Sequence, residues 1–177
     1  MGKRSNFEKK PRNYYRTFDP KAGDALAPFV SMSALYLEPF AGAGDLVVNL
    51  NRHDIRCIGM SDIEPQAEGI EQRCAFSYTN DEMWRYDYLI SNPPWAKSVF
   101  HRTLDHYVPM IDCWFLMSSN WKQNKGSARY VDNWLCDIVP IGRLKWIEGT
   151  AHSAMDDCEW LHFSRLKNEP ARFHSRG

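Results

Sequence analysis

Ala34-Leu35-Tyr36-Leu37-Glu38-Pro39-Phe40-Ala41-Gly42-Ala43-Gly44, residues 34–44, joins an apolar, β-prone run to a turn of small residues. The apolar run predicts a buried strand over 34–40. Gly42 and Gly44 would let a ligand approach the backbone of the turn closely, because glycine has no side chain in the way. Asp45 directly after the turn is a good N-cap residue for a following helix. The stretch therefore predicts a strand, a ligand-accessible turn and a helix in succession.

The same alternation of strands and helices continues along the chain on both sides of this unit. Helical spacing of apolar residues predicts helices at 23–33, 45–52, 66–72, 97–107 and 122–131. Runs of β-prone residues predict strands at 34–40, 55–60, 74–78, 86–90, 111–117, 135–139 and 159–163. Strands that alternate with helices favour an α/β fold, with a mainly parallel sheet covered by helices on both faces.

Length and composition predict one globular domain of an intracellular protein. The 177 residues are 44% hydrophobic and contain no apolar run long enough to cross a bilayer and no signal-peptide pattern. The five cysteines form no CxxC pair and the six histidines form no pair at ligand spacing, so we expect reduced cysteines, no metal site and a cytoplasmic location.

Positive charge is concentrated at the two ends of the chain. The first 16 residues carry Lys3, Arg4, Lys9, Lys10, Arg12 and Arg16 against one acid, Glu8. Residues 165–177 carry Arg165, Lys167, Arg172 and Arg176 against Glu169. Because the whole chain has zero net charge, the body between the ends is acidic. We expect a basic flexible leader at 1–13, one catalytic domain at 14–165 and a basic tail at 166–177. Basic ends of this kind either bind a polyanion or only confer solubility.

Three of the expected strands end in residues suited to binding a nucleoside. The first ends in the glycine turn, the second ends at Asp62, and the fourth ends in Asn92-Pro93-Pro94-Trp95. Ligands of parallel α/β sheets bind beyond the carboxyl ends of the strands, where an acid can accept hydrogen bonds from a ribose. The turn lacks the third glycine of the dinucleotide fingerprint, and the chain has no Gly-Lys-Ser/Thr phosphate loop, which disfavours NAD and ATP.

The Asn92–Trp95 loop has the composition of a clamp for a planar amine. Its two prolines fix φ and remove two backbone donors, so the loop is stiff and its carbonyls lack nearby amide partners. Asn92 and these carbonyls would accept hydrogen bonds from an amine, and Trp95 would offer a ring face for stacking. The alternative is an ordinary turn at the end of a strand.

Several of these segments resemble one family of enzymes. Residues 38–44 and 92–95 look like motifs I and IV of the S-adenosylmethionine-dependent amino-methyltransferases, above all the DNA N6-adenine methyltransferases. Residues 61–65 match the second motif of that family, and residues 15–20 resemble its upstream motif, with Phe18 where proline is common. Residues 141–149 and 158–160 resemble small methyltransferase-like proteins of bacteriophages, so that the likeness covers most of residues 14–163.

The resemblance implies a Rossmann-like class I methyltransferase fold, S-adenosyl-L-methionine as cofactor and a set of site residues. The implied catalytic residues are Asn92, Pro93, Pro94 and Trp95. The implied cofactor-binding residues are Thr17, Glu38, Phe40, Gly42, Gly44, Asp62, Ile63 and Asn92. Lys145 and Trp146 are expected to contact substrate. The residue that meets the cofactor's adenine amine stays open between Ser77 and Asp81, because the region around them departs from the family pattern.

The function implied is methylation of the N6 amino group of adenine in DNA. The same loop motif serves enzymes that methylate adenine in RNA or glutamine in proteins, so these substrates remain alternatives. A third alternative is a non-catalytic relative that binds cofactor or DNA and acts against host restriction. The expected partner is nucleic acid, without a membrane, and target recognition would involve a partner chain or a homo-oligomer.

Overall fold

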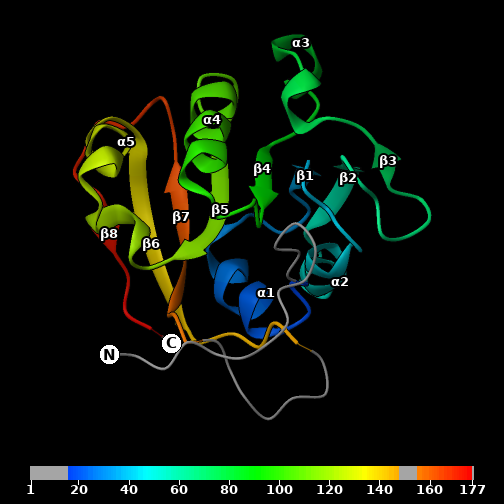
Figure 1. Ribbon diagram of the computed structural model, residues 1–177, viewed down its shortest axis with the longest axis horizontal. Helices are drawn as coiled ribbons and strands as arrows, with labels where there is room; N and C mark the ends of the chain where they lie inside the picture. Colours follow the sequence, from blue (N-terminus) through cyan, green and yellow to red (C-terminus); the bar gives the residue numbers. More distant parts are fainter. Residues whose placement is uncertain (1–15, 148–154, 177) are drawn as a thin grey trace.

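The structure is a computed structural model that describes residues 16–147 and 155–176. One sheet of eight strands runs through these residues in the order β3-β2-β1-β4-β5-β7-β6-β8, which Figure 1 shows from right to left. The strands are β1 (Leu35–Glu38), β2 (Arg56–Asp62), β3 (Glu71–Gln72), β4 (Tyr88–Ser91), β5 (Cys113–Ser118), β6 (Leu135–Gly142), β7 (Cys158–Phe163) and β8 (Arg172–Phe173). All neighbours pair in parallel except β7, which runs antiparallel to both β5 and β6. The predicted α/β class with a mainly parallel sheet is confirmed.

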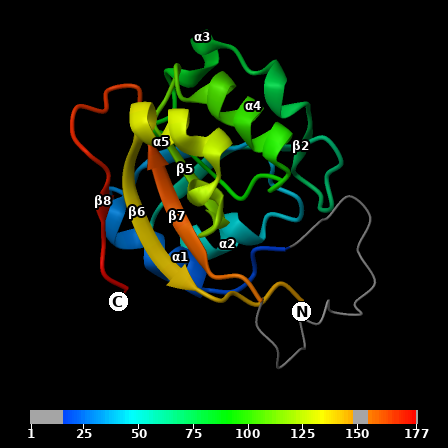
Figure 2. The same ribbon diagram turned by 60° about the vertical axis from the view of Figure 1, so that its left-hand side comes forward.

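Helices cover both faces of this sheet, as Figure 2 also shows. On one face lie α1 (Lys21–Leu26), the 3-10 turn η2 (Ala27–Phe29) and α2 (Asp45–Asn51), and on the other lie α4 (Lys97–Tyr107) and α5 (Ala128–Trp134). The central strand β5 shows why both faces need cover. Its residues alternate between two cores, with Trp114 and Leu116 packed under α1 and α2 and Phe115 and Met117 packed under α4 and α5.

The segment between β2 and β4 differs from the prediction. A helix over 66–72 and a strand over 74–78 were expected, but residues 63–70 form turns, β3 comes earlier, and residues 75–77 form the 3-10 turn η3 (Ala75–Ser77) before the short helix α3 (Asn80–Met83). Gly69, at φ +83°, interrupts the expected helix. The expected strand fails because the Tyr107 hydroxyl donates to the Ala75 carbonyl, which holds this backbone against α4 instead of in the sheet.

The other differences concern the ends of elements. The helix expected at 23–33 begins at Lys21 and ends at Leu26, because Pro28 has no N–H to continue it and the chain tightens into η2. The helix expected at 122–131 is two 3-10 turns, η4 (Trp121–Gln123) and η5 (Lys125–Ser127), followed by α5.

Residues expected to form a basic tail contribute a strand. Arg172 and Phe173 pair with Asp137 and Ile138 of β6, and Arg172 donates a hydrogen bond to the Asp137 carboxylate. A buried carboxylate therefore draws the basic segment onto the sheet. The expected leader at 1–13 lies outside the described residues, and no helix that the structure describes is long and apolar enough to cross a membrane.

Candidate active site

The carboxyl ends of β1, β2 and β4 meet at one edge of the sheet because these three strands are parallel neighbours. Glu38 is the last residue of β1, Asp62 the last of β2 and Ser91 the last of β4. The glycine turn follows Glu38, and the Asn92–Trp95 loop follows Ser91. The fold thus gathers the three expected strand ends at the edge where parallel sheets bind ligands.

Glu38 forms the buried floor of this edge, with 1% of its surface exposed. The Ser91 hydroxyl donates a hydrogen bond to its carboxyl group, and the Phe40 backbone N–H donates to the same oxygen at 3.1 Å. Burial nevertheless outweighs these two hydrogen bonds and raises the pKa of Glu38 to about 8. Ser91 was not among the residues expected from the sequence, and only its place at the end of a buried strand pointed to it.

Asp62 closes the glycine turn through its side chain. One carboxylate oxygen accepts from the Gly42 N–H at 2.9 Å, and the other accepts from the Glu64 N–H at 2.8 Å. Gly42 and Gly44 have φ of 56° and 82°, a left-handed backbone that favours glycine. Two glycines and one acid together therefore fix the shape of the turn.

Asp45 is not the N-cap that the sequence suggested. Gly44 occupies that position and Asp45 is the first residue of α2. Its carboxylate instead binds Arg16 through two hydrogen bonds, of 2.8 Å from Nε and 2.6 Å from Nη2. This ion pair fixes the chain just before Thr17.

Asn92 lies between Thr17 and Trp95 and bonds to both. Its Nδ2 donates to the Thr17 hydroxyl at 2.9 Å, and its Oδ1 accepts from the Trp95 indole N–H at 3.1 Å. The indole N–H also donates to the Leu116 carbonyl at 3.0 Å. Thr17 is buried, and its own carbonyl accepts from the Asn49 amide at 2.7 Å. The Asn92 amide is thus held by Thr17, 75 positions away in the sequence, and by Trp95, 3 positions away.

The segment expected to contact substrate lies beside this loop. The Trp146 ring meets the Trp95 ring edge to face, with centroids 5.6 Å apart. The Lys145 backbone N–H donates to the buried Asp19 carboxylate at 2.9 Å, which ties the segment to the chain near Thr17. Asp19 belongs to the upstream motif but was not predicted to be a site residue. The feature of the sequence that could have indicated its role is an acidic side chain within an aromatic stretch.

The remaining expected residues surround the turn. Pro93 is buried and Pro94 exposed. Ile63 exposes 63% of its surface directly after Asp62, and Phe40 contacts Phe76 edge to face at 6.3 Å. The Ser77 hydroxyl is engaged by Arg73 and by the Cys74 carbonyl, whereas Asp81 is exposed in the first turn of α3. Neither arrangement identifies the residue that meets an adenine amine.

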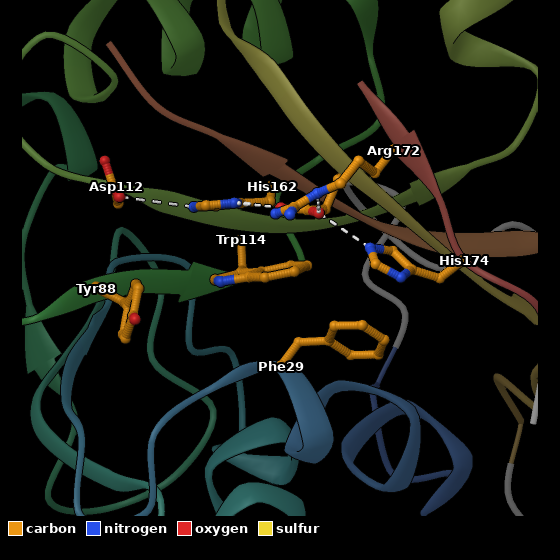
Figure 3. Close-up of a pocket in the computed structure, with 8 residues that line it drawn as sticks. Phe29, Tyr88, Asp112, Trp114, His162, Arg172 and His174 are labelled. Atoms are coloured by element: carbon orange, nitrogen blue, oxygen red, sulfur yellow. Dashed lines mark hydrogen bonds and ion pairs between the residues drawn. The ribbon is translucent and has the colours of Figure 1, made fainter. Parts of the chain in front are cut away.

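A second cluster of polar side chains lies at the opposite edge of the sheet and lines a pocket of about 280 Å³, shown in Figure 3. The pocket is lined by Phe29, Tyr88, Asp112, Trp114, Asp137, His162, Arg172 and His174. Its centre is the buried Asp137, which accepts hydrogen bonds from His162 Nδ1 at 2.9 Å, His174 Nε2 at 2.9 Å and Arg172 Nε at 3.0 Å. His162 stacks on Trp114, with centroids 4.6 Å apart. These contacts join β8 to the sheet, and in the described chain no group of His, Cys, Asp and Glu could hold a metal ion.

Comparison with known proteins bears on this architecture. A candidate RNA methyltransferase of Pyrococcus horikoshii superposes with a TM-score of 0.61 at 12% identity, over 90% of this chain and 92% of that one. A candidate class I S-adenosylmethionine-dependent methyltransferase of Listeria monocytogenes superposes with a TM-score of 0.56 at 10% identity, over 88% of this chain and 64% of that one. The chain has the class I methyltransferase fold.

The modification subunit of a candidate type I restriction enzyme from Vibrio vulnificus shares this class I methyltransferase fold, with a TM-score of 0.56 at 14% identity over 89% of the present chain. The present chain spans 45% of that subunit's length. No family model and no curated protein matches the sequence. At these identities the likeness concerns the fold.

Proposed function

We propose that this protein is an S-adenosylmethionine-dependent methyltransferase that methylates the N6 amino group of adenine in DNA. The observation that carries the proposal is the Asn92–Trp95 loop, whose oriented amide oxygen stands at the end of β4 beside the turn that Asp62 closes. An acceptor group for an amine and a turn suited to a nucleoside are therefore neighbours, as transfer of a methyl group between them requires.

The residues around the turn fit the cofactor chemically. Ile63 is a large apolar side chain left exposed, and packing against an adenine ring would cover it. Asp62 uses one lone pair on each oxygen for the Gly42 and Glu64 backbones, so each oxygen keeps acceptor capacity for a ribose hydroxyl. Bound there, S-adenosylmethionine would supply an electrophilic methyl group.

The loop would activate the amine by geometry and charge. The lone pair of an exocyclic amine is delocalised into the ring, which makes the nitrogen a poor nucleophile. Hydrogen bonds from the amine to Asn92 Oδ1 and the Pro93 carbonyl would draw the nitrogen toward tetrahedral geometry and point its lone pair at the methyl group. The same acceptors stand where positive charge develops during transfer. The product ammonium loses its proton readily, so no strong general base is required.

Two features favour DNA as the substrate over RNA or protein glutamine. The basic residues at the start of the sequence suit a polyanion, and one protein with the same fold is the modification subunit of a candidate type I restriction enzyme. An RNA methyltransferase candidate and a dimethyladenosine transferase of Plasmodium falciparum also share the fold, which keeps adenine in RNA as the second candidate. Adenine in duplex DNA would have to leave the stack, at a cost of roughly a few kcal/mol.

Target recognition would draw on a second surface. The chain spans 45% of the Vibrio subunit and 62% of the Plasmodium transferase, so it corresponds to part of each. We expect relaxed sequence specificity, or a partner chain or second copy that supplies recognition, in the cytoplasm of the cell where the protein is made.

Incubation with radiolabelled S-adenosylmethionine and, in separate reactions, DNA, RNA and cell extract tests the proposal. Label is expected in DNA as N6-methyladenine, and Asn92→Ala should reduce it at least about a hundredfold because the amine loses its oriented acceptor. The exposed Asn133→Ala in α5 is the matched control and should keep full activity.

The possible outcomes separate the candidates. Label found in RNA or in protein glutamine, and not in DNA, would identify that polymer as the substrate in place of DNA. Calorimetric binding of the cofactor without label in any polymer would favour a binding-only relative that interferes with restriction. Absence of both binding and label would refute the proposal.

A further inference from the structure

The Trp95 side chain is oriented differently from a simple stacking platform. Its indole N–H points at two acceptors, Asn92 Oδ1 at 3.1 Å and the Leu116 carbonyl at 3.0 Å. Its ring is partly buried, packs against both cores of the sheet and meets Trp146 edge to face. Ring position and N–H direction are thus both fixed by the protein.

The two acceptors of the indole lie on different elements. Asn92 follows β4, whereas Leu116 belongs to β5 and lies one residue beyond the last β4–β5 pair, Ser91 with Phe115. The indole therefore ties the loop to the neighbouring strand where pairing between the two strands has ended.

An amide side chain can turn over by 180°, which exchanges its oxygen and nitrogen, and the two partners of Asn92 decide its orientation. The Thr17 hydroxyl can either donate or accept, so it would tolerate the oxygen or the nitrogen of the amide. An indole N–H can only donate, so it requires the oxygen. Trp95 therefore selects the orientation in which Oδ1 lies on its side and Nδ2 bonds to Thr17.

We propose that Trp95 is a positioning residue that, through its indole N–H, fixes the Asn92 amide with its oxygen available to the substrate amine. This role rests on the proposed methyl transfer and assigns the aromatic residue of the loop a polar task. The indole takes one lone pair of Oδ1 and leaves one, so the group offered to substrate is a single oriented acceptor. Phenylalanine or tyrosine at this position would keep a ring but lack a donor at this point.

Substrate selection follows from that geometry. With Nδ2 bound to Thr17 and Oδ1 directed to the substrate, the loop accepts a target that donates a hydrogen bond. An exocyclic amine can do so, whereas the carbonyl oxygen of a base would meet the lone pair of Oδ1. Trp95 thus favours amino bases over keto bases through the orientation that it gives to the Asn92 amide.

The first test does not depend on activity. In a 15N–1H spectrum of the labelled protein, the Trp95 indole signal is assigned by its loss in Trp95→Phe. Asn92→Ala should shift this signal, and its hydrogen exchange should be slower than that of Trp84, whose side chain is 84% exposed. An unshifted Trp95 signal in Asn92→Ala would refute the proposal even if the enzyme is active.

The second test separates positioning from stacking by kinetics. Trp95→Phe should lower kcat about five- to tenfold, the size of one lost hydrogen bond, while KM for DNA and cofactor affinity stay within about twofold. Thr17→Val should lower kcat more than Thr17→Ser, which keeps the hydroxyl. Trp84→Phe is the control for loss of an indole and should leave both constants unchanged.

A kinetic result without a fall in kcat would overturn the inference. An unchanged kcat in Trp95→Phe, with or without a raised KM, would mean that only the ring matters and that the indole N–H has no positioning role. If the wild-type protein methylates no polymer, the proposed function fails, and the spectrum still decides whether the indole fixes the amide. Circular dichroism of each variant establishes that the fold is retained.

Discussion

At the scale of single residues, the fold strongly alters the acidity of the Glu38 carboxyl. It is enclosed at the end of β1, and its pKa rises to about 8 because burial outweighs the hydrogen bonds from Ser91 and Phe40. In the unfolded chain the same group ionises near pH 4.5. Between these values the folded state keeps a proton that the unfolded state releases, so this group destabilises the fold as pH rises.

Glu38→Gln should therefore stabilise the protein increasingly from pH 5 to pH 8. Glutamine keeps the acceptor oxygen for Ser91 and Phe40 but has no proton to lose. The gain over wild type in free energy of unfolding should be near zero at pH 4 and on the order of several kcal/mol at pH 8. Urea denaturation at each pH measures it, with the exposed Glu68→Gln as control. A gain that does not change with pH would contradict the assignment.

At the scale of elements, the turn between β1 and α2 depends on the end of β2. Asp62→Ala removes the acceptor for both the Gly42 and Glu64 N–H groups and should lower the affinity for S-adenosylmethionine at least about tenfold. Asp62→Asn keeps one acceptor oxygen and should therefore lower the affinity for S-adenosylmethionine less than Asp62→Ala does. Isothermal calorimetry measures the affinity, with the exposed Asp132→Ala in α5 as control. Unchanged affinity in Asp62→Ala would place the ribose elsewhere.

Some helices and strands could be predicted from the sequence alone, and others could not. The helix at 97–107 was predicted with its observed ends, because an apolar stripe decides such a helix locally. The strand predicted at 74–78 was wrong, because the contact that decides this segment comes from Tyr107, far along the chain. The helix predicted at 66–72 was wrong because Gly69, with its positive φ, interrupts it. Glu38 and Asp62 were expected at the ligand-binding edge, although the first strand was predicted two residues too long, to Phe40, and the second two residues too short, to Met60. The bonds of Asn92 to Thr17 and Trp95 were not predictable, since spacing says nothing about the direction of an amide.

At the scale of the whole molecule, the Asp137 cluster joins the C-terminal strand β8 to the sheet. Burial alone would raise the pKa of Asp137, but hydrogen bonds from His174, His162 and Arg172 outweigh this effect and lower it. Burial likewise opposes the charge on His162, whose pKa is nevertheless raised by Asp112 and Asp137. The Asp137 contribution to stability is lost as pH falls through its lowered pKa, and the His162 contribution is lost as pH rises through its raised pKa.

Asp137→Asn should accordingly lower the free energy of unfolding by about 3 kcal/mol near pH 6, because His162, His174 and Arg172 lose their buried anion. The difference from wild type should shrink as pH falls through the lowered pKa of Asp137 and also as pH rises through the raised pKa of His162. Thermal unfolding followed by circular dichroism across this range measures it. Methyl transfer assayed at low temperature should be unaffected, since the cluster lies at the other edge of the sheet; a loss of kcat there would contradict a purely structural role.

The antiparallel strand β7 has a consequence for how the protein is made. It lies between β5 and β6, yet it follows both in the chain. While a ribosome is still producing β7, the two earlier strands each carry an unpaired edge lined with apolar side chains. A nascent or truncated chain that stops before Cys158 lacks β8 as well as β7, so one edge of β5 and both edges of β6 are free to pair with other chains. Slow translation through this region, or deletion of it, should send the product into aggregates.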